Sequence, residues 1–218
     1  MLCRAVDVAQ HDLVVAGTRG LTAWQTFFLS STAQSLIRKC PSPVWVVKSE
    51  HAGPPKVVLA ATDFSDVSRK GVQASLAVAE AAGAEFHLLH VIDANDVSES
   101  IAPRAADAGL LRQKVNDPAR RRFDEFLSTL QTSYAVRSHI SWGVPWQEIQ
   151  RLVGELKVDL LALGTVGRGG IPGLFLGNTA EKVLSVCDCS LLTVKPADFK
   201  SSIPLVDPAT PLPESESS

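Results

Sequence analysis

The chain has 218 residues, of which 45% are hydrophobic and 20% are charged, and its net charge is −2. This composition is ordinary for a soluble globular protein, and the length accommodates one full domain of about 140 residues with further chain to spare. The charge gives no broad positive field for nucleic acid, no apolar run approaches the roughly 18 to 20 residues of a membrane helix, and the first residues lack the apolar core of a signal peptide, which together predict a cytoplasmic protein that binds neither nucleic acid nor membranes.

The first predicted elements belong to an incomplete tandem repeat. Residues 12–48 return without a gap as residues 159–195, and twelve of the 37 aligned positions are identical. The identical pairs include Gly17/Gly164, Gly20/Gly167, Thr32/Thr179, Cys40/Cys187 and Lys48/Lys195. Met1 aligns with Glu148, and nothing before it corresponds to residues 56–147, so the first copy holds only the closing part of the repeated unit.

We therefore expect four segments. Residues 1–50 form the C-terminal fragment of a first domain, residues 51–55 a linker, residues 56–196 a complete domain, and residues 197–218 a polar, proline-rich, disordered tail. The fragment has one helix between two short strands, which is too little chain to bury a core of its own. It should pack on the complete copy or on another chain.

The complete copy begins with a strand, a helix and a second strand. Lys56–Ala61 is a continuously apolar run, which is typical of a strand buried on both faces of a parallel sheet. Ser65 and Asp66 offer N-caps to a helix that ends at Gly83, and Glu85–Ile92 is the second buried strand.

The second half of the complete copy continues the alternation. Residues 93–116 are its least regular part, with which a mobile lid and a plain connector are both compatible. Asp117 and Pro118, a cap followed by a proline, predict the start of a helix. The remaining predicted elements are a strand at Ala135–Trp142, a helix after Pro145, a strand at Val158–Leu163, a helix at Asn178–Val186 and a strand at Ser190–Lys195. This alternation predicts an α/β domain whose parallel sheet has helices on both faces.

Two of these strands end in residues suited to binding an anion. The first strand is followed by Thr62 and Asp63, and the fourth leads into a glycine-rich loop before the helix at Asn178. Glycines let main-chain N–H groups approach an anion, and a helix N-terminus adds unpaired amides. Asn178 and Glu181 fit an N-cap and an N3 acid. A phosphate site and a loop that serves only the turn both remain open, because the dinucleotide and Walker glycine patterns are absent.

Three motifs resemble those of the universal stress protein family. They are Gly164-x2-Gly167-x9-Gly177-Asn178, Ala61-Thr62-Asp63-Phe64-Ser65 and Leu89-His90-Val91-Ile92-Asp93. The likeness extends to both copies, so the chain resembles a tandem member whose first copy is truncated. The resemblance implies a Rossmann-like fold of the adenine nucleotide alpha hydrolase type, with a five-stranded parallel sheet of order 3-2-1-4-5. The ends of strands one and four would then lie side by side.

The resemblance also implies a binding site for ATP, with or without Mg²⁺. The residues carried over for adenosine are Thr62, Asp63 and Val91, and those for the phosphates are Gly164, Gly167, Gly177, Asn178 and Thr179. Asn178 departs from the family, whose ATP-binding members usually have Ser or Thr there; an amide is bulkier beside a phosphate, although Thr179 retains a hydroxyl.

The fragment departs further from the family pattern. Ser30 and Ser31 replace the Gly177-Asn178 pair, and Trp24, Phe27 and Phe28 crowd the loop. Because it also lacks a first strand, we expect the fragment to bind no nucleotide. The family further implies that last strands pair antiparallel, either between the subunits of a homodimer or within one chain. Here Val44–Lys48 would lie beside Leu191–Lys195, which removes two exposed edges.

The sequence indicates no dedicated enzyme. None of the histidines, His11, His51, His87, His90 and His139, sits in a nucleophile-and-base pattern, and the H-x-G-H motif of related hydrolases and transferases is absent. His87 and His90 are three residues apart on a strand and should face opposite ways, with His90 a buried, hydrogen-bonded core residue. The Cys187-x-Cys189 spacing is not that of a zinc site, so no metal is expected.

The function that this reasoning favours is an ATP-binding stress-response regulator, in which slow ATP hydrolysis is compatible but no reaction is committed. The first alternative is an interaction scaffold of the same fold that binds no nucleotide and works through its paired edges. The second is a protein that binds another phosphate-bearing ligand at the same loop.

Overall fold

The computed structural model describes residues 6, 11–18, 31–48, 53–93, 108–166, 176–197 and 199, with the side chains of all of these except 108–116. Within these ranges, seven strands form one sheet in the order β1-β2-β7-β6-β3-β4-β5. Their bounds are β1 Val14–Gly17, β2 Val44–Val47, β3 Val57–Ala61, β4 Glu85–Ile92, β5 Val136–Trp142, β6 Leu160–Gly164 and β7 Ser190–Val194. The five strands of the complete copy are parallel to one another, and their order is the predicted 3-2-1-4-5.

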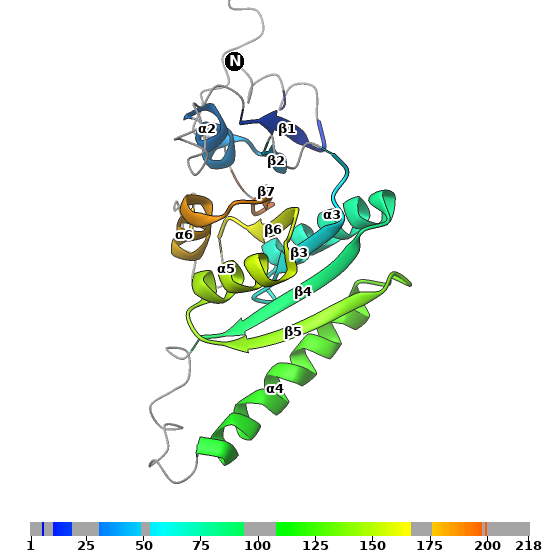
Figure 1. The fold of residues 1–218 in the computed structure, drawn as a ribbon, viewed down its shortest axis with the longest axis vertical. Coiled ribbons are helices and arrows are strands. Elements are labelled where there is room, and N and C mark those ends of the chain that lie inside the picture. The colour runs from blue at the N-terminus through cyan, green and yellow to red at the C-terminus, as the bar shows by residue number, and fades with distance from the viewer. Residues whose placement is uncertain are drawn as a thin grey trace, which may run out of the picture.

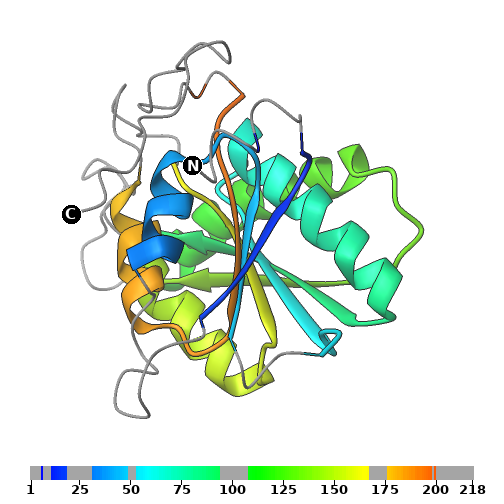
Figure 2. The same cartoon turned by 90° about the horizontal axis from the view of Figure 1, so that it is seen from above.

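Helices cover both faces of the sheet, as predicted, and divide the core in two. The helices are α2 Ser31–Lys39, α3 Asp66–Ala82, α4 Ala108–Thr129, α5 Pro145–Leu156 and α6 Asn178–Val186. Figure 1 shows α3 and α4 on one side of the sheet and α5 and α6 on the other, and Figure 2 shows α2 beside α6. One buried cluster joins the sheet to α2, α5 and α6, and the second joins it to α3 and α4. No helix in the described part of the chain is both long and apolar enough to cross a membrane.

The ends of α3 follow from its sequence. Ser65 has an extended backbone and its side chain accepts a hydrogen bond from the backbone N–H of Ser68, which caps the first turn. Gly83 closes the helix in the left-handed conformation, with φ of 64°, where a residue without Cβ is favoured. Both caps agree with the prediction.

The predicted start of α4 is wrong. The helix begins at Ala108, nine residues before Asp117, and Pro118 lies inside it. Proline removes one helical hydrogen bond, which is why the sequence indicated a boundary there. Pro118 is exposed, so water can satisfy the carbonyl that loses its donor, and the buried Phe123 and Phe126 hold the helix on the sheet.

The fragment docks on the complete copy, as predicted. β2 pairs antiparallel with β7, with Val44 opposite Thr193 and Val46 opposite Leu191, and β1 then pairs parallel with β2. Val44 and Val46 are almost fully buried and belong to the cluster that contains the core residues of α2 and α6. The pairing that the family resemblance implied therefore lies within one chain.

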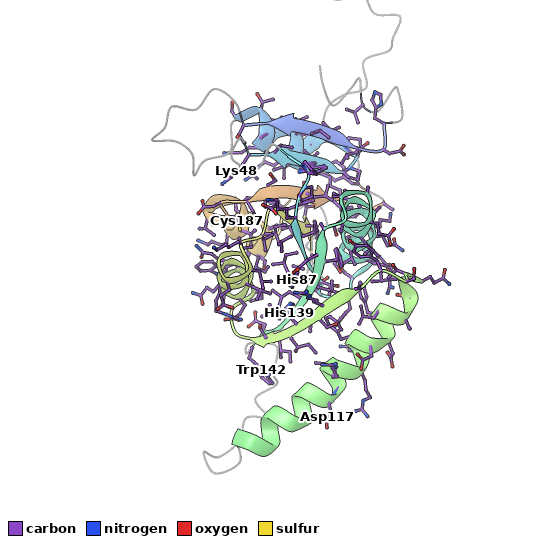
Figure 3. All side chains as sticks on the ribbon, turned by 45° about the vertical axis from the view of Figure 1, so that its right-hand side comes forward. Lys48, His87, Asp117, His139, Trp142 and Cys187 are labelled. Atoms are coloured by element: carbon purple, nitrogen blue, oxygen red, sulfur yellow. The ribbon has the colours of Figure 1, made fainter. Side chains whose placement is uncertain are left out.

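Two lysines stabilise the junction, which is the contact between the fragment and the complete copy along β2 and β7. Each lysine belongs to one copy and binds a helix of the other. Lys48 follows β2, and its Nζ donates a hydrogen bond to the carbonyl of Cys187 at the end of α6. Lys195 follows β7, and its Nζ donates to the carbonyl of Ile37 in the last turn of α2. Both lysines are buried, and each meets the partly negative C-terminal end of a helix from the other copy. Figure 3 shows Lys48 and Cys187 on facing sides of the junction.

A histidine pair links β4 to β5 on the opposite side of the molecule. The Nδ1 atom of His87 lies 2.8 Å from the Nε2 atom of His139, and their rings stack with centroids 5.1 Å apart (Figure 3). One ring donates and the other accepts, so one of the two must be neutral. Burial lowers the pKa of both rings, and for His139 the positive charges of His87, Arg151 and Arg137 lower it further.

The lysine junction yields a stability prediction. We expect Lys48→Met and Lys195→Met each to destabilise the docked fragment by about 1–3 kcal/mol, because a buried carbonyl loses its donor. Hydrogen exchange at the amides of Val44 to Val47 should quicken in both variants while exchange in β4 is unchanged. Lys70→Met, an exposed site on α3, is the matched control. Equal exchange in all three variants would show that the lysines do not hold the fragment.

The histidine pair yields a pH prediction. Because the pKa of each histidine is below the ordinary 6.5 in the folded state, the unfolded chain binds more protons than the folded chain near that pH. The free energy of unfolding should therefore be highest above about pH 6.5 and should fall as the pH drops below it. Urea unfolding at pH 7.5 and pH 5.5 measures this loss. His139→Gln should reduce the difference between the two pH values, whereas His11→Gln, at an exposed site, should not. A loss of stability that His139→Gln leaves unchanged would contradict the assignment.

Candidate functional site

The loop after β3 holds the first predicted site residues in a fixed conformation. The backbone N–H of Thr62 donates to Leu89 O at 2.8 Å, and its Oγ1 accepts from the N–H of Phe64 at 3.0 Å. The Oδ1 atom of Asp63 accepts from both the N–H and the hydroxyl of Ser65, at 3.1 and 2.6 Å. The half-buried carboxylate of Asp63 is thereby oriented at the N-terminus of α3.

This loop contains a strained residue that the sequence did not reveal. Phe64 has φ of 65°, a conformation that costs a bulky side chain of order 1–3 kcal/mol. Its ring lies 4.1 Å from that of His90 and 5.6 Å from that of Phe126. The Nδ1 atom of His90 is 2.8 Å from the carbonyl oxygen of Thr62, which confirms His90 as a buried, hydrogen-bonded core residue. His90 and Phe126 therefore hold the strained turn in place.

Val91 stands at the same end of the sheet. Ala61 pairs with Leu89, so two residues further along each chain Asp63 and Val91 are level with each other. Val91 is half-buried and packs against the cluster on the α5 side, opposite to the side of His90 and Phe64. His87 likewise faces away from His90, as predicted.

Gly164 ends β6, the neighbour of β3 in the sheet. A Cβ atom there would come 3.0 Å from Cγ1 of Val67 and 3.4 Å from the backbone nitrogen of Ser68. The strand end thus passes so close to the first turn of α3 that a side chain at this position would fit only if Val67 shifted by a few tenths of an ångström. Because β3 and β6 are parallel neighbours, the ends carrying Asp63 and Gly164 lie at one edge of the sheet.

Thr165 is a residue at this edge that sequence reasoning did not single out. Its N–H donates to Val194 O at 2.9 Å, and its carbonyl accepts from the N–H of Gly177 at 2.7 Å, so it closes the base of the glycine loop. Its side chain is fully buried, yet Oγ1 has no hydrogen-bond partner among the residues that the structure describes. Thr165 is identical to the aligned Thr18 of the first copy, and this identity is the sequence signal that could have identified it.

The prediction that Asn178 caps α6 is wrong. Gly177 is the N-cap, with an extended backbone, and its carbonyl accepts the first helical hydrogen bond from Glu181 at 2.9 Å. Asn178 is the first helical residue and is exposed, while Thr179 is half-buried. Because Gly177 has no side chain, no side-chain hydrogen bond caps α6, in contrast to α3. The first turn of α6 therefore offers its amides at the same edge.

The middle of the glycine loop lies outside the described residues, and with it Gly167. The same is true of Trp24, Phe27, Phe28 and Ser30 in the fragment. Thr62, Asp63, Val91, Gly164, Gly177, Asn178 and Thr179 are all described, and each lies at or just beyond the carboxyl end of its strand or at the start of α6. Within the described ranges, no group of three or more His, Cys, Asp or Glu side chains gathers as in a metal site.

Known proteins match this chain along nearly its whole length. Universal stress protein E of Salmonella typhi is 28% identical to it, over 95% of this chain and 68% of the relative. The protein of the same name from Escherichia coli K12 is 29% identical, over 90% of this chain and 65% of the relative. The chain thus spans about two thirds of the length of these relatives.

Solved structures share the fold. A putative universal stress protein from Pseudomonas aeruginosa UCBPP-PA14 superposes with a TM-score of 0.70 at 23% identity, over 91% of this chain and 68% of that one. A universal stress protein from Archaeoglobus fulgidus gives a TM-score of 0.60 at 20% identity, over 89% and 65%. The sequence model that describes the universal stress protein family matches residues 1–48 and 55–195. The chain therefore belongs to the universal stress protein family.

Proposed function

We propose that this chain binds ATP, with or without Mg²⁺, at the edge of the sheet where β3 and β6 end, and that it works in the cytoplasm as a stress-response regulator without a dedicated reaction. The observation that carries the proposal is the placement of one oriented carboxylate, Asp63, on the strand next to the one that leads to an uncapped helix N-terminus at Gly177. In open α/β sheets, ligands usually bind outside the carboxyl ends of the strands, at the point where the strand order reverses. In this sheet that point lies between β3 and β6.

The adenosine would be held on the β3 and β4 side. A carboxylate accepts several hydrogen bonds, and Ser65 fixes the plane of the Asp63 carboxylate for the two ribose hydroxyls. Val91, half-buried and level with Asp63, supplies an apolar surface for the base. Thr62 is held by four hydrogen bonds, which fix the backbone beside Asp63.

The phosphates would be held on the β6 and α6 side. The first turn of α6 combines amides without a side-chain cap with the positive end of the helix dipole, which favours an anion. Thr179 adds a hydroxyl in that turn, and Gly164, which has no side chain, lets the end of β6 lie against the first turn of α3. We assign Gly167 to the same role from its motif alone.

The geometry favours binding over hydrolysis. His90 is the histidine next to Asp63, but its ring contacts the carbonyl of Thr62 and the ring of Phe64 on the α4 side. It is engaged in holding the loop and is turned away from the side of Val91. Two alternative functions must be distinguished from ATP binding. One is an interaction scaffold that binds no nucleotide, and the other is a protein that binds another phosphate-bearing ligand.

Titration of ATP by calorimetry tests the proposal. The unaltered chain should bind with a micromolar Kd, and Asp63→Ala should weaken binding roughly 10- to 150-fold, because a hydrogen bond to a charged group is worth about 1.5–3 kcal/mol. Gly167→Val should also abolish or weaken binding by crowding the amides. Asp66→Ala removes an exposed carboxylate from the first turn of α3 and serves as the matched control. Absence of binding by the unaltered chain would favour the scaffold.

A second prediction concerns Asn178, the departure from the family. Asn178→Ser should tighten ATP about two- to tenfold, since a smaller side chain with a hydroxyl meets the phosphates at the start of α6. Binding of AMP should change less, because its single phosphate lies nearer the ribose. Asn178→Ala separates the effect of size from that of the hydroxyl. Equal gains for ATP and AMP would place residue 178 away from the terminal phosphates.

A further inference from the structure

Two cysteines lie close together between α6 and β7. Cys187 follows the last residue of α6, and Cys189 precedes the first residue of β7. Their exposed fractions are 2% and 1%, and both are free thiols. The two side chains share a hydrogen bond, so their sulfur atoms face each other. Two residue steps span at most about 7 Å, and a disulfide needs Cα atoms roughly 4.4–6.8 Å apart, so this pair is within reach of a disulfide.

Lys48 brings a positive charge to this pair from the other copy (Figure 3). Its Nζ donates a hydrogen bond to the carbonyl oxygen of Cys187 at 2.5 Å and lies 3.8 Å from Oδ1 of Asp188. Its backbone N–H donates to the hydroxyl of Ser190 at 3.2 Å. The ammonium group is thereby held beside the segment that carries both thiols. A cation next to a thiol favours the thiolate, which is the form that acts as a nucleophile.

The two thiols differ in how readily they lose a proton. The hydrogen bond from Cys189 lowers the pKa of the Cys187 thiol, burial raises it, and the charge of Lys48 lowers it again, with a pKa below the ordinary value as the result. The same hydrogen bond and burial raise the pKa of the Cys189 thiol. Cys187 is therefore the better nucleophile, and Cys189 keeps its proton. A nucleophilic thiol next to a second thiol is the arrangement in which a sulfenic acid is converted to a disulfide.

The repeat provides a counterpart with one thiol. Cys40 aligns with Cys187 and is fully buried just after α2, as Cys187 is just after α6. Ser42 stands where the complete copy has Cys189. The two sites thus share the place in the fold and the burial of the first cysteine, and they differ in the second. Cys40 therefore serves as a reference within the same molecule for a buried cysteine without a cysteine two residues later.

We propose that Cys187 and Cys189 form a site of reversible oxidation by hydrogen peroxide. The Cys187 thiolate attacks one peroxide oxygen, the O–O bond breaks, and the products are a sulfenic acid at Cys187 and hydroxide, which is protonated to water. The sulfur of Cys189 then attacks the sulfur of Cys187, the S–O bond breaks, and the proton of Cys189 leaves with the hydroxyl group as water. The two thiols thus supply the two electrons that reduce peroxide to two water molecules.

Burial selects the oxidant by size. Thiol–disulfide exchange requires access to the attacked sulfur, so a thiol that is almost fully buried excludes a bulky disulfide such as oxidised glutathione. Hydrogen peroxide is little larger than water. Cys187 also follows the end of a helix, where the chain opens at a low free-energy cost. A small peroxide therefore reaches the pair where a larger oxidant does not.

Peptide mapping of the full chain by mass spectrometry tests the proposal. Cys3→Ser is introduced first, so that the remaining cysteines are those at positions 40, 187 and 189. After hydrogen peroxide and alkylation, the peptide with Cys187 and Cys189 should be two hydrogen atoms lighter and should escape alkylation. Dithiothreitol should reverse the change. Oxidised glutathione at the same concentration should modify the pair at least tenfold more slowly, and Cys40 should enter no disulfide.

Two variants assign the roles. In Cys189→Ser, peroxide should leave a sulfenic acid at Cys187 that dimedone captures, because the thiol that closes the disulfide is missing. In Cys187→Ser, capture at Cys189 should be at least tenfold slower. Unchanged amide exchange at Val46, in the β2 ladder, shows that the junction is intact in both variants. Equal capture in the two intact variants contradicts the assignment of the nucleophile.

The chain with all three buried cysteines decides the proposal even if a variant unfolds. Thiols at positions 187 and 189 that survive peroxide overturn it, and so does a disulfide that joins either of them to Cys40. Equal rates with peroxide and with oxidised glutathione overturn it too, because the site would then be open to bulky oxidants.

Discussion

The antiparallel pairing of β2 with β7 is the contact on which the arrangement of this chain depends. All five residues of β7 are buried, and without β2 its outer edge would expose a row of ladder groups beside an apolar face. The fragment in turn has its core residues, such as Val44 and Ile37, in a cluster that it shares with the complete copy. Each copy therefore covers apolar residues of the other. Lys48 and Lys195 add hydrogen bonds to carbonyls at the C-terminal ends of α6 and α2, which would otherwise be unpaired.

The two copies differ on the side that faces away from the β2–β7 pairing, where β6 and β1 lie. In the complete copy β6 lies between β7 and β3, and its end at Gly164 lies against the first turn of α3. Among the described residues, β1 pairs with β2, and none of the described strands takes beside it the place that β3 has beside β6.

Much of this could be predicted because it depends on local or repeated signals. Apolar runs located the strands, Ser65 and Gly83 marked both ends of α3, and the repeat together with the family resemblance gave the sheet order and the β2–β7 pairing. The predictions that failed depend on contacts and backbone conformations of the folded chain that the sequence does not show. Gly177 rather than Asn178 caps α6, because the backbone there is already extended before the helix begins. Pro118 sits inside α4, because downstream phenylalanines anchor the helix across it.

Three of the features that escaped prediction lie at the carboxyl end of the sheet. Phe64 holds a positive φ, Thr165 buries a hydroxyl that has no partner among the described residues, and α6 starts without a side-chain cap. The first two each cost of order 1–3 kcal/mol, in a fold whose total stability is typically only about 5–15 kcal/mol. Comparable terms occur elsewhere, because Gln131 and Lys157 also hold a positive φ and the buried Trp45 Nε1 has no hydrogen-bond partner among the described residues. Unfavourable terms alone therefore do not mark the candidate site, whereas the oriented Asp63 carboxylate lies on the strand next to the one that leads to the N-terminus of α6, which is the arrangement at this edge of the sheet.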